Sequence, residues 1–226
     1  MRVDLHCHTE ASDDCQTRLT DMPDRCRSQN VRVQAITDHN VIWGAQQLRA
    51  SVRDQGLEAT LSIIVGEEIS TRQGEIIGLF LQEVVPAGLS AEETAEIIHA
   101  QGGLVLLPHG FDPLKRHRLR SEARERLADH IDIVESFNAR ISAPHWNRVA
   151  AVWATQHRLP VSGGSDAHTL TQIGDGWIET VDRLIQRPDD LMEALWSGEV
   201  AGRWVHPVPS FLNKVWAERF MVASRE

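Results

Sequence analysis

The sequence predicts a single α/β domain over residues 1–226, folded as a distorted (β/α)7 barrel of the TIM type. Short apolar runs rich in β-branched residues alternate with amphipathic segments along the chain. Histidines and carboxylates follow many of these runs directly, at the positions where the loops of a βα barrel carry functional residues. A length of 226 residues, with 42% hydrophobic and 24% charged residues, suits one globular domain with a substantial core.

The expected elements follow one another in βα order, with one exception. Strands are predicted at residues 3–8, 33–37, 61–65, 75–81, 103–107, 131–135 and 159–162. Helices are predicted at residues 19–29, 43–55, 91–101, 121–129, 143–157, 189–197 and 210–222. Ser90 and Glu93 form a capping box at the head of the third helix. Only a turn containing Gly, Thr and Gln separates the strands at 61–65 and 75–81, which predicts a local hairpin.

The first strand ends in the most informative motif of the chain, His6-Cys7-His8. Side chains alternate across a strand, so His6 and His8 leave the same face while Cys7 points away. Two imidazoles placed in this way are a common means of holding a catalytic transition metal.

Further polar clusters follow the later strands. They are Ser12-Asp13-Asp14, Thr37-Asp38-His39-Asn40, Gly66-Glu67-Glu68-Ile69-Ser70, Pro108-His109-Gly110 and Gly164-Ser165-Asp166-Ala167-His168. Residues at strand ends converge on one mouth of a βα barrel, so this placement predicts a common site. Imidazole and carboxylate groups suit Zn, Mn or Fe, and there are too many of them for one ion. We therefore expect two or three divalent metal ions.

In this order, the motifs resemble those of the PHP (polymerase and histidinol phosphatase) family over nearly the whole chain. The resemblance implies a distorted seven-stranded βα barrel that binds up to three metals at its C-terminal mouth. It implies that the first metal is held by His6, His8, Glu68 and Asp166. It implies that the second is held by Glu68, as a bridge, with His109 and Glu75, and the third by Asp13, His39 and His168.

Two positions depart from the family pattern. Many relatives carry His where this chain has Glu75, and a carboxylate oxygen there favours Mn or Fe over Zn. Relatives also commonly have Gly where this chain has Asp14. Either Asp13 or Asp14 could therefore be the ligand, and the motif spacing favours Asp13.

Three residues are candidates for contacts with a substrate. Asn138 and Arg140 follow the strand at 131–135, and similar Asn-x-Arg residues occur in relatives. Arg116 belongs to a basic segment that comes directly after His109, and arginine suits bidentate recognition of phosphate.

The predicted activity is metal-dependent phosphoester hydrolysis (EC 3.1 type), most simply by a phosphomonoesterase that uses a metal-bound hydroxide at a di- or trinuclear centre. Asp166 and His168 are the expected catalytic residues, with His168 able to protonate the leaving alkoxide. Two alternatives stay open: a metal-dependent amide or ester hydrolase of the amidohydrolase type, and a non-catalytic metal-binding domain.

Charge and composition limit the classes of substrate and partner that we expect. The formal net charge of -9 argues against binding of long nucleic acid, so a small phosphorylated metabolite or a nucleotide is the expected substrate. No apolar stretch approaches the roughly 20 residues of a membrane span. The first strand begins within two residues of Met1, which indicates no signal peptide, and three unpatterned cysteines fit a reducing compartment. We expect a cytoplasmic protein.

Overall fold

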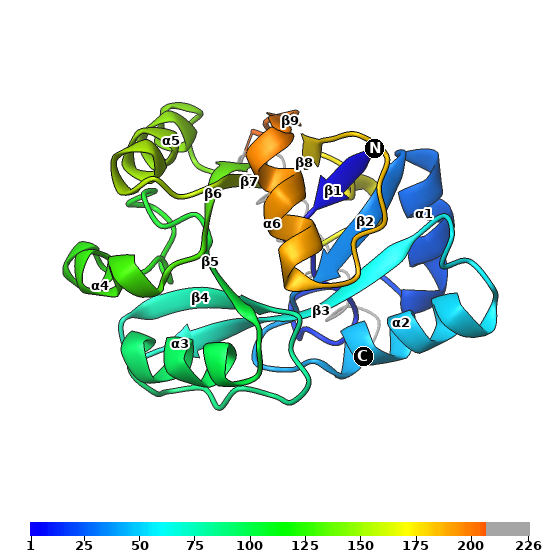
Figure 1. Cartoon of the computed structure of the whole chain (residues 1–226), viewed down its shortest axis with the longest axis horizontal. Coiled ribbons are helices and arrows are strands. Elements are labelled where there is room, and N and C mark those ends of the chain that lie inside the picture. Colours follow the sequence, from blue (N-terminus) through cyan, green and yellow to red (C-terminus); the bar gives the residue numbers. More distant parts are fainter. Residues whose placement is uncertain (207–226) are drawn as a thin grey trace, which may run out of the picture.

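The computed structural model describes residues 1–206, whose strands wind into a barrel with helices around it (Figure 1). Within these residues nine strands form one sheet, in the order β7-β6-β5-β4-β3-β2-β1-β8-β9. The strands are β1 (Arg2–Asp4), β2 (Val31–Ile36), β3 (Ser62–Thr71), β4 (Gly74–Leu79), β5 (Leu104–Leu107), β6 (Ile133–Asn138), β7 (Val161–Gly164), β8 (Gly176–Glu179) and β9 (Glu199–Gly202).

The helices lie where the apolar periodicity predicts them. They are α1 (Met22–Ser28), α2 (Trp43–Asp54), α3 (Ala91–Ala100), α4 (Ser121–Leu127), α5 (His145–His157) and α6 (Pro188–Ser197). Short 3-10 turns extend α1 at its start and α4 at its end. The capping box is present, because the Ser90 hydroxyl accepts a hydrogen bond from the Glu93 backbone N–H and the Glu93 carboxylate accepts one from the Ser90 backbone N–H. The helix predicted at 210–222 lies outside the described residues.

Strand direction explains how residues far apart in the chain share one end of the barrel. β1, β2 and β3 pair in parallel, as do β5, β6 and β7. β4 runs antiparallel to both of its neighbours, β3 and β5, which confirms the predicted hairpin. The start of β4 therefore lies at the same mouth as the ends of the parallel strands, and Glu75 pairs with Ser70 there.

The barrel closes through an irregular continuation of β1. The Leu5 backbone N–H donates to the Gly163 carbonyl at 3.3 Å, and the His8 N–H donates to the Ala167 carbonyl at 3.0 Å. β8 adds to β1 in antiparallel orientation, and β9 adds to β8. Neither β8 nor β9 was expected from the sequence, because each has only four residues and begins or ends with glycine.

The hydrophobic core has two parts. One lies between the strands and the outer helices, and includes Leu48 of α2 and Ile98 of α3. The other fills the barrel interior and joins Val3, Leu5 and Ile133 to Leu191 and Leu195 of α6. Figure 1 shows α6 lying across the barrel, so this helix closes the end of the barrel opposite the polar mouth.

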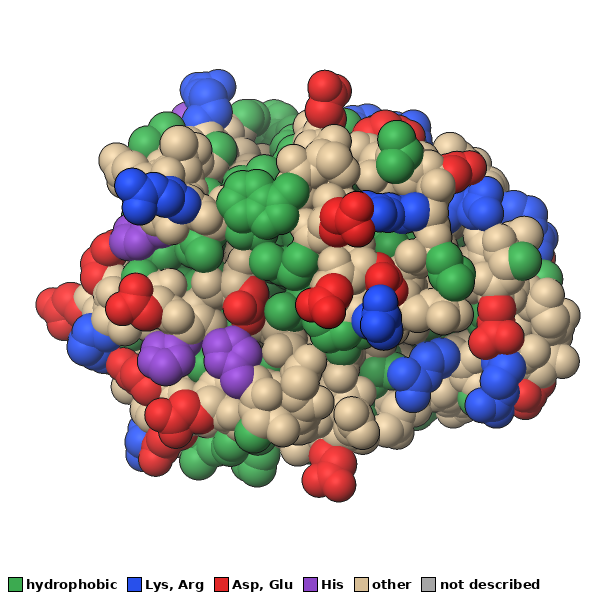
Figure 2. Space-filling view, in the orientation of Figure 1, with side chains coloured by type: hydrophobic (Ala, Val, Ile, Leu, Met, Phe, Trp, Pro, Cys, Tyr) green, Lys and Arg blue, Asp and Glu red, His purple; other side chains and the backbone are tan. Residues whose placement is uncertain are grey.

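The outer surface is mixed in charge on the face that carries α6. Lys and Arg side chains are interspersed there with Asp and Glu (Figure 2). Among the helices of residues 1–206, none is long and apolar enough to pass through a bilayer.

Candidate metal centre

The barrel mouth brings together eight of the nine predicted metal ligands. Their ligand atoms form four overlapping groups, each within 4.8 Å. The groups are His6/His8/Glu68, His6/His109/Asp166, His39/Glu68/Glu75 and His8/His39/His168. The overlap means that the residues surround one continuous polar region, which lies beyond the ends of β1, β2, β5 and β7, beside the middle of β3 and the start of β4.

The buried pair His6 and His8 lies at the middle of this region. Their Nε2 atoms are 3.2 Å apart, and each is 3.3 Å from Glu68 Oε2. Asp166 Oδ1 lies 3.8 Å from His6 Nε2 and 3.6 Å from His8 Nε2. Two ligands bound to one ion at about 2.0–2.2 Å lie roughly 3 to 3.5 Å apart, so these spacings suit a shared cation.

Glu68 faces two different sets of ligands with its two oxygens. Oε1 is 2.9 Å from His109 Nε2, while Oε2 is 3.4 Å from His39 Nδ1. Glu75 Oε1 lies 3.9 Å from the same His39 nitrogen. This is the geometry of a carboxylate that can bridge neighbouring cations.

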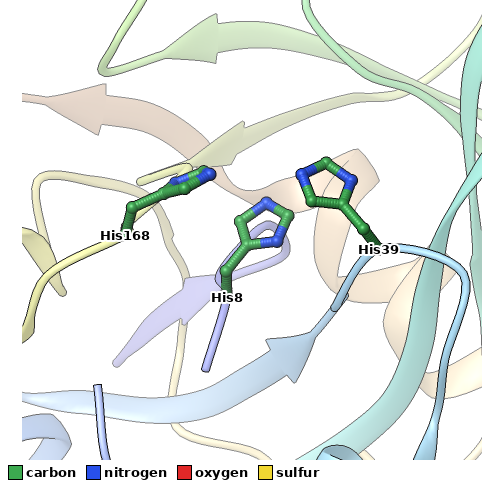
Figure 3. A group of neighbouring side chains, drawn as sticks. All are labelled: His8, His39 and His168. Atoms are coloured by element: carbon green, nitrogen blue, oxygen red, sulfur yellow. The ribbon is translucent and has the colours of Figure 1, made fainter. Parts of the chain in front are cut away.

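His8, His39 and His168 form the outer group, with their rings turned towards one another (Figure 3). The ring centroid of His8 is 4.5 Å from that of His39 and 4.3 Å from that of His168. They come from the segments after β1, β2 and β7, so three distant stretches of sequence meet here.

Asp14, and not the favoured Asp13, is the carboxylate that contacts the outer histidines. Asp14 Oδ2 is 3.0 Å from His168 Nε2, and Oδ1 is 3.9 Å from His39 Nε2. Asp13 and Asp14 are both exposed, and with His39 they line a pocket of about 330 Å³. Both aspartates lie in a turn in which the Cys15 N–H donates to the Ser12 carbonyl, and motif spacing does not show which of them faces the histidines.

Glu135, which the sequence did not indicate as a site residue, orients two of the candidate ligands, His6 and His109, without belonging to any of the four groups. Its Oε1 lies 3.0 Å from His6 Nδ1, and its Oε2 accepts from the His109 backbone N–H at 2.8 Å and from Asn138 Nδ2 at 3.0 Å. A carboxylate on the outer nitrogen of an imidazole fixes the ring and leaves Nε2 free for a metal. The sequence feature that could have indicated Glu135 is its place as a glutamate inside the apolar run of β6.

The ring of His8 is held in the same manner through Ser12. The Ser12 hydroxyl is 3.3 Å from His8 Nδ1 and donates to Asp38 Oδ1 at 2.8 Å. The Thr9 backbone N–H also donates to Asp38 Oδ1, at 2.6 Å. Asp38 therefore acts on the imidazole through a hydroxyl rather than by direct contact.

Backbone geometry around Gly164 allows these side chains to approach. A Cβ atom at Gly164 would lie 2.3 Å from Glu135 Oε1 and 2.5 Å from His6 Cβ, so any larger residue would displace both. His109 and Asp166 have positive φ values of 27° and 50°. Non-glycine residues in this region are strained, and such strain is concentrated at functional sites.

The electrostatics of the cluster favour a bound cation. Burial, together with the nearby charges of Glu68 and Asp166, raises the pKa of Glu75 to about 9. Burial opposes ionisation of Glu68, but His6 and hydrogen bonds from His109 hold its pKa well below the usual range. A divalent cation offsets the repulsion among several carboxylates. The nitrogen and oxygen ligand atoms and their spacing fit divalent metals. So do the contacts that Glu135 and Ser12 make with the Nδ1 atoms of His6 and His8.

The predicted substrate contacts surround Asp166. Asn138 Nδ2 donates to Asp166 Oδ2 at 3.3 Å, and Arg140 Nη1 donates to its carbonyl oxygen at 3.0 Å. Arg140 also contacts His168 Nδ1. Arg116 is exposed, whereas Lys115 places Nζ 2.5 Å from Asp166 Oδ2. The basic segment thus enters the site through the residue next to the predicted one.

A family model of the PHP domain matches residues 4–138, and a model of the PHP-associated region matches residues 144–200. The chain belongs to the PHP family. PHP membership agrees with the order of the metal-site motifs along the barrel, and it confirms the resemblance that those motifs carry.

Two relatives of this PHP chain match it over very different lengths. An uncharacterized protein of Methanocaldococcus jannaschii is 35% identical over 196 residues, which make up 84% of this chain and 75% of that protein. A 5'-3' exoribonuclease of Haemophilus influenzae is 35% identical over 89 residues, 38% of this chain and 31% of that protein.

A solved structure confirms the predicted barrel. It is a two-domain protein from Bacteroides vulgatus that contains a predicted PHP-like metal-dependent phosphoesterase. The TM-score is 0.72 at 16% identity, and the match covers 90% of this chain and 65% of that chain.

Proposed function

We propose that this PHP protein is a metal-dependent phosphomonoesterase that hydrolyses a small phosphorylated metabolite or a nucleotide. One observation carries the proposal: a buried cluster of nitrogen and oxygen ligands is flanked by two cations, Lys115 and Arg140, on its Asp166 side. The ligands suit divalent metals, and the two cations suit the phosphate that those metals would activate.

The proposed centre holds two or three ions of Zn, Mn or Fe. As the motifs imply, His6, His8, Glu68 and Asp166 would hold the first ion, and Glu68, His109 and Glu75 the second. In the structure, Glu75 groups with Glu68 and His39, while His109 groups with His6 and Asp166. His39 and His168 would hold the third, with Asp14 as the carboxylate in place of Asp13. Bound metals of this kind supply Lewis acidity and a water of lowered pKa at neutral pH.

The remaining residues have roles that follow from their contacts. Lys115 and Arg140 would bind the non-bridging phosphate oxygens, while Asn138 keeps Asp166 in place. Burial, with the charges of His8 and Arg140, lowers the pKa of His168 to about 4. A neutral imidazole at physiological pH suits a metal ligand, so we favour that role for His168 over the role of proton donor to the leaving alkoxide.

The test is hydrolysis by the full chain loaded separately with Zn, Mn and Fe. We expect release of phosphate from a generic aryl phosphate and no hydrolysis of aryl amides. His8→Ala should lose essentially all turnover, because it removes a ligand shared by two of the groups. His99→Ala is the matched control, since His99 pairs with Asp132 on the outer side of the barrel. Hydrolysis of the amides alone would contradict the proposal and favour the amidohydrolase alternative.

A second candidate is removal of nucleotides from the ends of short RNA. It is supported by the 35% identity over 89 residues to the Haemophilus influenzae protein named as a 5'-3' exoribonuclease. The net charge of -9 opposes binding of a long polymer, which is why we place this candidate second. The products separate the two, because a phosphomonoesterase releases inorganic phosphate while an exonuclease releases mononucleotides.

A further inference from the structure

A buried carboxylate outside the metal centre joins the two loops that carry Lys115 and Arg140. Asp112 is fully buried in the loop after β5. Its Oδ1 accepts hydrogen bonds from the Leu114 backbone N–H at 2.9 Å and from the Ser142 hydroxyl at 2.7 Å. Its Oδ2 accepts from the Ser142 backbone N–H at 2.7 Å. Ser142 lies in the loop after β6, so one side chain connects two loops.

Both loops reach the same target. Lys115 follows Asp112 by three residues, and its backbone N–H donates to the Asp112 carbonyl at 3.1 Å. Arg140 precedes Ser142 by two residues. Lys115 Nζ lies 2.5 Å from Asp166 Oδ2, while Arg140 Nη1 lies 3.4 Å from Asp166 Oδ1. The separation of the two cations therefore depends on how the loops are joined.

We propose that Asp112 is a positioning residue that holds Lys115 and Arg140 as a pair which binds the phosphate of a phosphate monoester. The inference rests on the proposed function and extends it to a residue whose carboxylate contacts Leu114 and Ser142 rather than the candidate metal ligands, while its backbone N–H donates to the His109 carbonyl at 3.4 Å. Although burial acts to raise the pKa of Asp112, hydrogen bonds from Ser142 and Leu114 and the charge of Lys115 lower it overall. The carboxylate is thus ionised at neutral pH, and its three accepted hydrogen bonds are charge-assisted.

Asp112→Ala tests the proposal in the metal-loaded full chain. We expect KM for aryl phosphate to rise by about tenfold, which corresponds to about 1.4 kcal/mol of lost binding. The kcat should change by less than about threefold, because loss of uniform binding raises KM alone. Inhibition by inorganic phosphate should weaken in parallel, and metal content should stay unchanged. Ser142→Ala, which removes one of the three hydrogen bonds, should give an intermediate rise in KM.

Two comparisons separate positioning from a general loss of structure. Asp132→Ala is the matched control, because Asp132 also joins two segments, through the Val105 backbone N–H and His99, on the outside of the barrel. It should leave KM unchanged. In a Lys115→Ala background, Asp112→Ala should add much less to KM than it does alone, because residues that act through one another are not additive.

The proposal is overturned if Asp112→Ala lowers kcat or metal content while KM stays the same, or if its effect is undiminished in the Lys115→Ala background. Absence of turnover by the wild-type protein would instead count against the proposed function. Calorimetric titration with inorganic phosphate then decides: weaker binding to Asp112→Ala than to wild type supports positioning. Equal binding to the two proteins, or none to wild type, overturns it.

Discussion

Glu135 shows how one buried side chain can organise a site that it does not enter. It holds the outer nitrogen of His6 and also accepts from the His109 backbone and from Asn138. Asn138 in turn contacts Asp166. Glu135 is therefore connected to candidate ligands that follow three different strands. Its replacement should disturb the positions of all three.

We expect Glu135→Gln to weaken metal affinity by about 10- to 100-fold, the usual range for loss of an outer partner of a metal-bound histidine. In glutamine an NH₂ group replaces one of the two carboxylate oxygens. This group would face either His6 Nδ1 or the two donors that now contact Oε2, the His109 backbone N–H and Asn138 Nδ2. The measurement is competition for metal against a chromophoric chelator. Glu122→Gln, the same change at an exposed position of α4, should leave the affinity as it is. Equal affinities for the two variants would show that Glu135 does not support the centre.

Individual residues also mark the limit of what the sequence could predict about the site. His6, His8, Glu68 and His109 converge as expected. His6, His8 and His109 follow the ends of β1 and β5, whereas Glu68 lies inside β3, beyond the part of this strand that pairs with β2. Asp14, one position after Asp13, contacts His168, and Lys115, one position before Arg116, contacts Asp166. Both pairs lie in irregular loops, where a single turn decides which neighbour points inwards, and composition carries no signal for that choice.

At the level of elements, α6 contributes to stability but lies far from the candidate metal centre, so substitutions in it test stability without changing the site. Leu191 on its inner face is fully buried against the barrel interior, at the end opposite the metal centre. Trp196 on the same helix is 62% exposed. The helix thus offers a buried and an exposed position that are both remote from the metal ligands.

We expect Leu191→Ala to lower the free energy of unfolding by about 2–5 kcal/mol, because it leaves a cavity among packed side chains. Urea denaturation of the two variants and the wild type is the measurement. Trp196→Ala should stay within about 0.5 kcal/mol of wild type. The folded Leu191→Ala protein should keep its metal content. A loss of metal at concentrations of urea where it is still folded would show that the substitution in α6 changes the site.

The elements also differ in how well their sequences predict them. Helices α2, α3 and α5 have ten or more residues and clear apolar faces, and their predicted bounds agree within two residues. β8 and β9 have four residues each, and β9 has no fully buried side chain. Such strands form because β1 and then β8 offer a free edge, which is a property of the tertiary structure.

At the scale of the whole molecule, the candidate metal centre gathers side chains from strands on both sides of the barrel. Its groups draw on segments from His6 near the start of the chain to His168. Unfolding separates all of these ligands, so the native state alone offers the assembled site. Ligands that bind only the native state stabilise it by an amount that grows with the logarithm of their concentration.

Metal should therefore raise the melting temperature of the full chain. At a free metal concentration of about 100 times Kd, the gain is about 2.7 kcal/mol. For a protein of this size that gain corresponds to an increase of roughly 5–11 °C. Scanning calorimetry of chelator-treated protein, with and without added Zn or Mn, measures the shift. His99→Ala should keep the increase, whereas Asp166→Ala should lose most of it. If wild-type protein retains metal and its melting temperature is unchanged, the metal does not bind at the site formed by these distant segments.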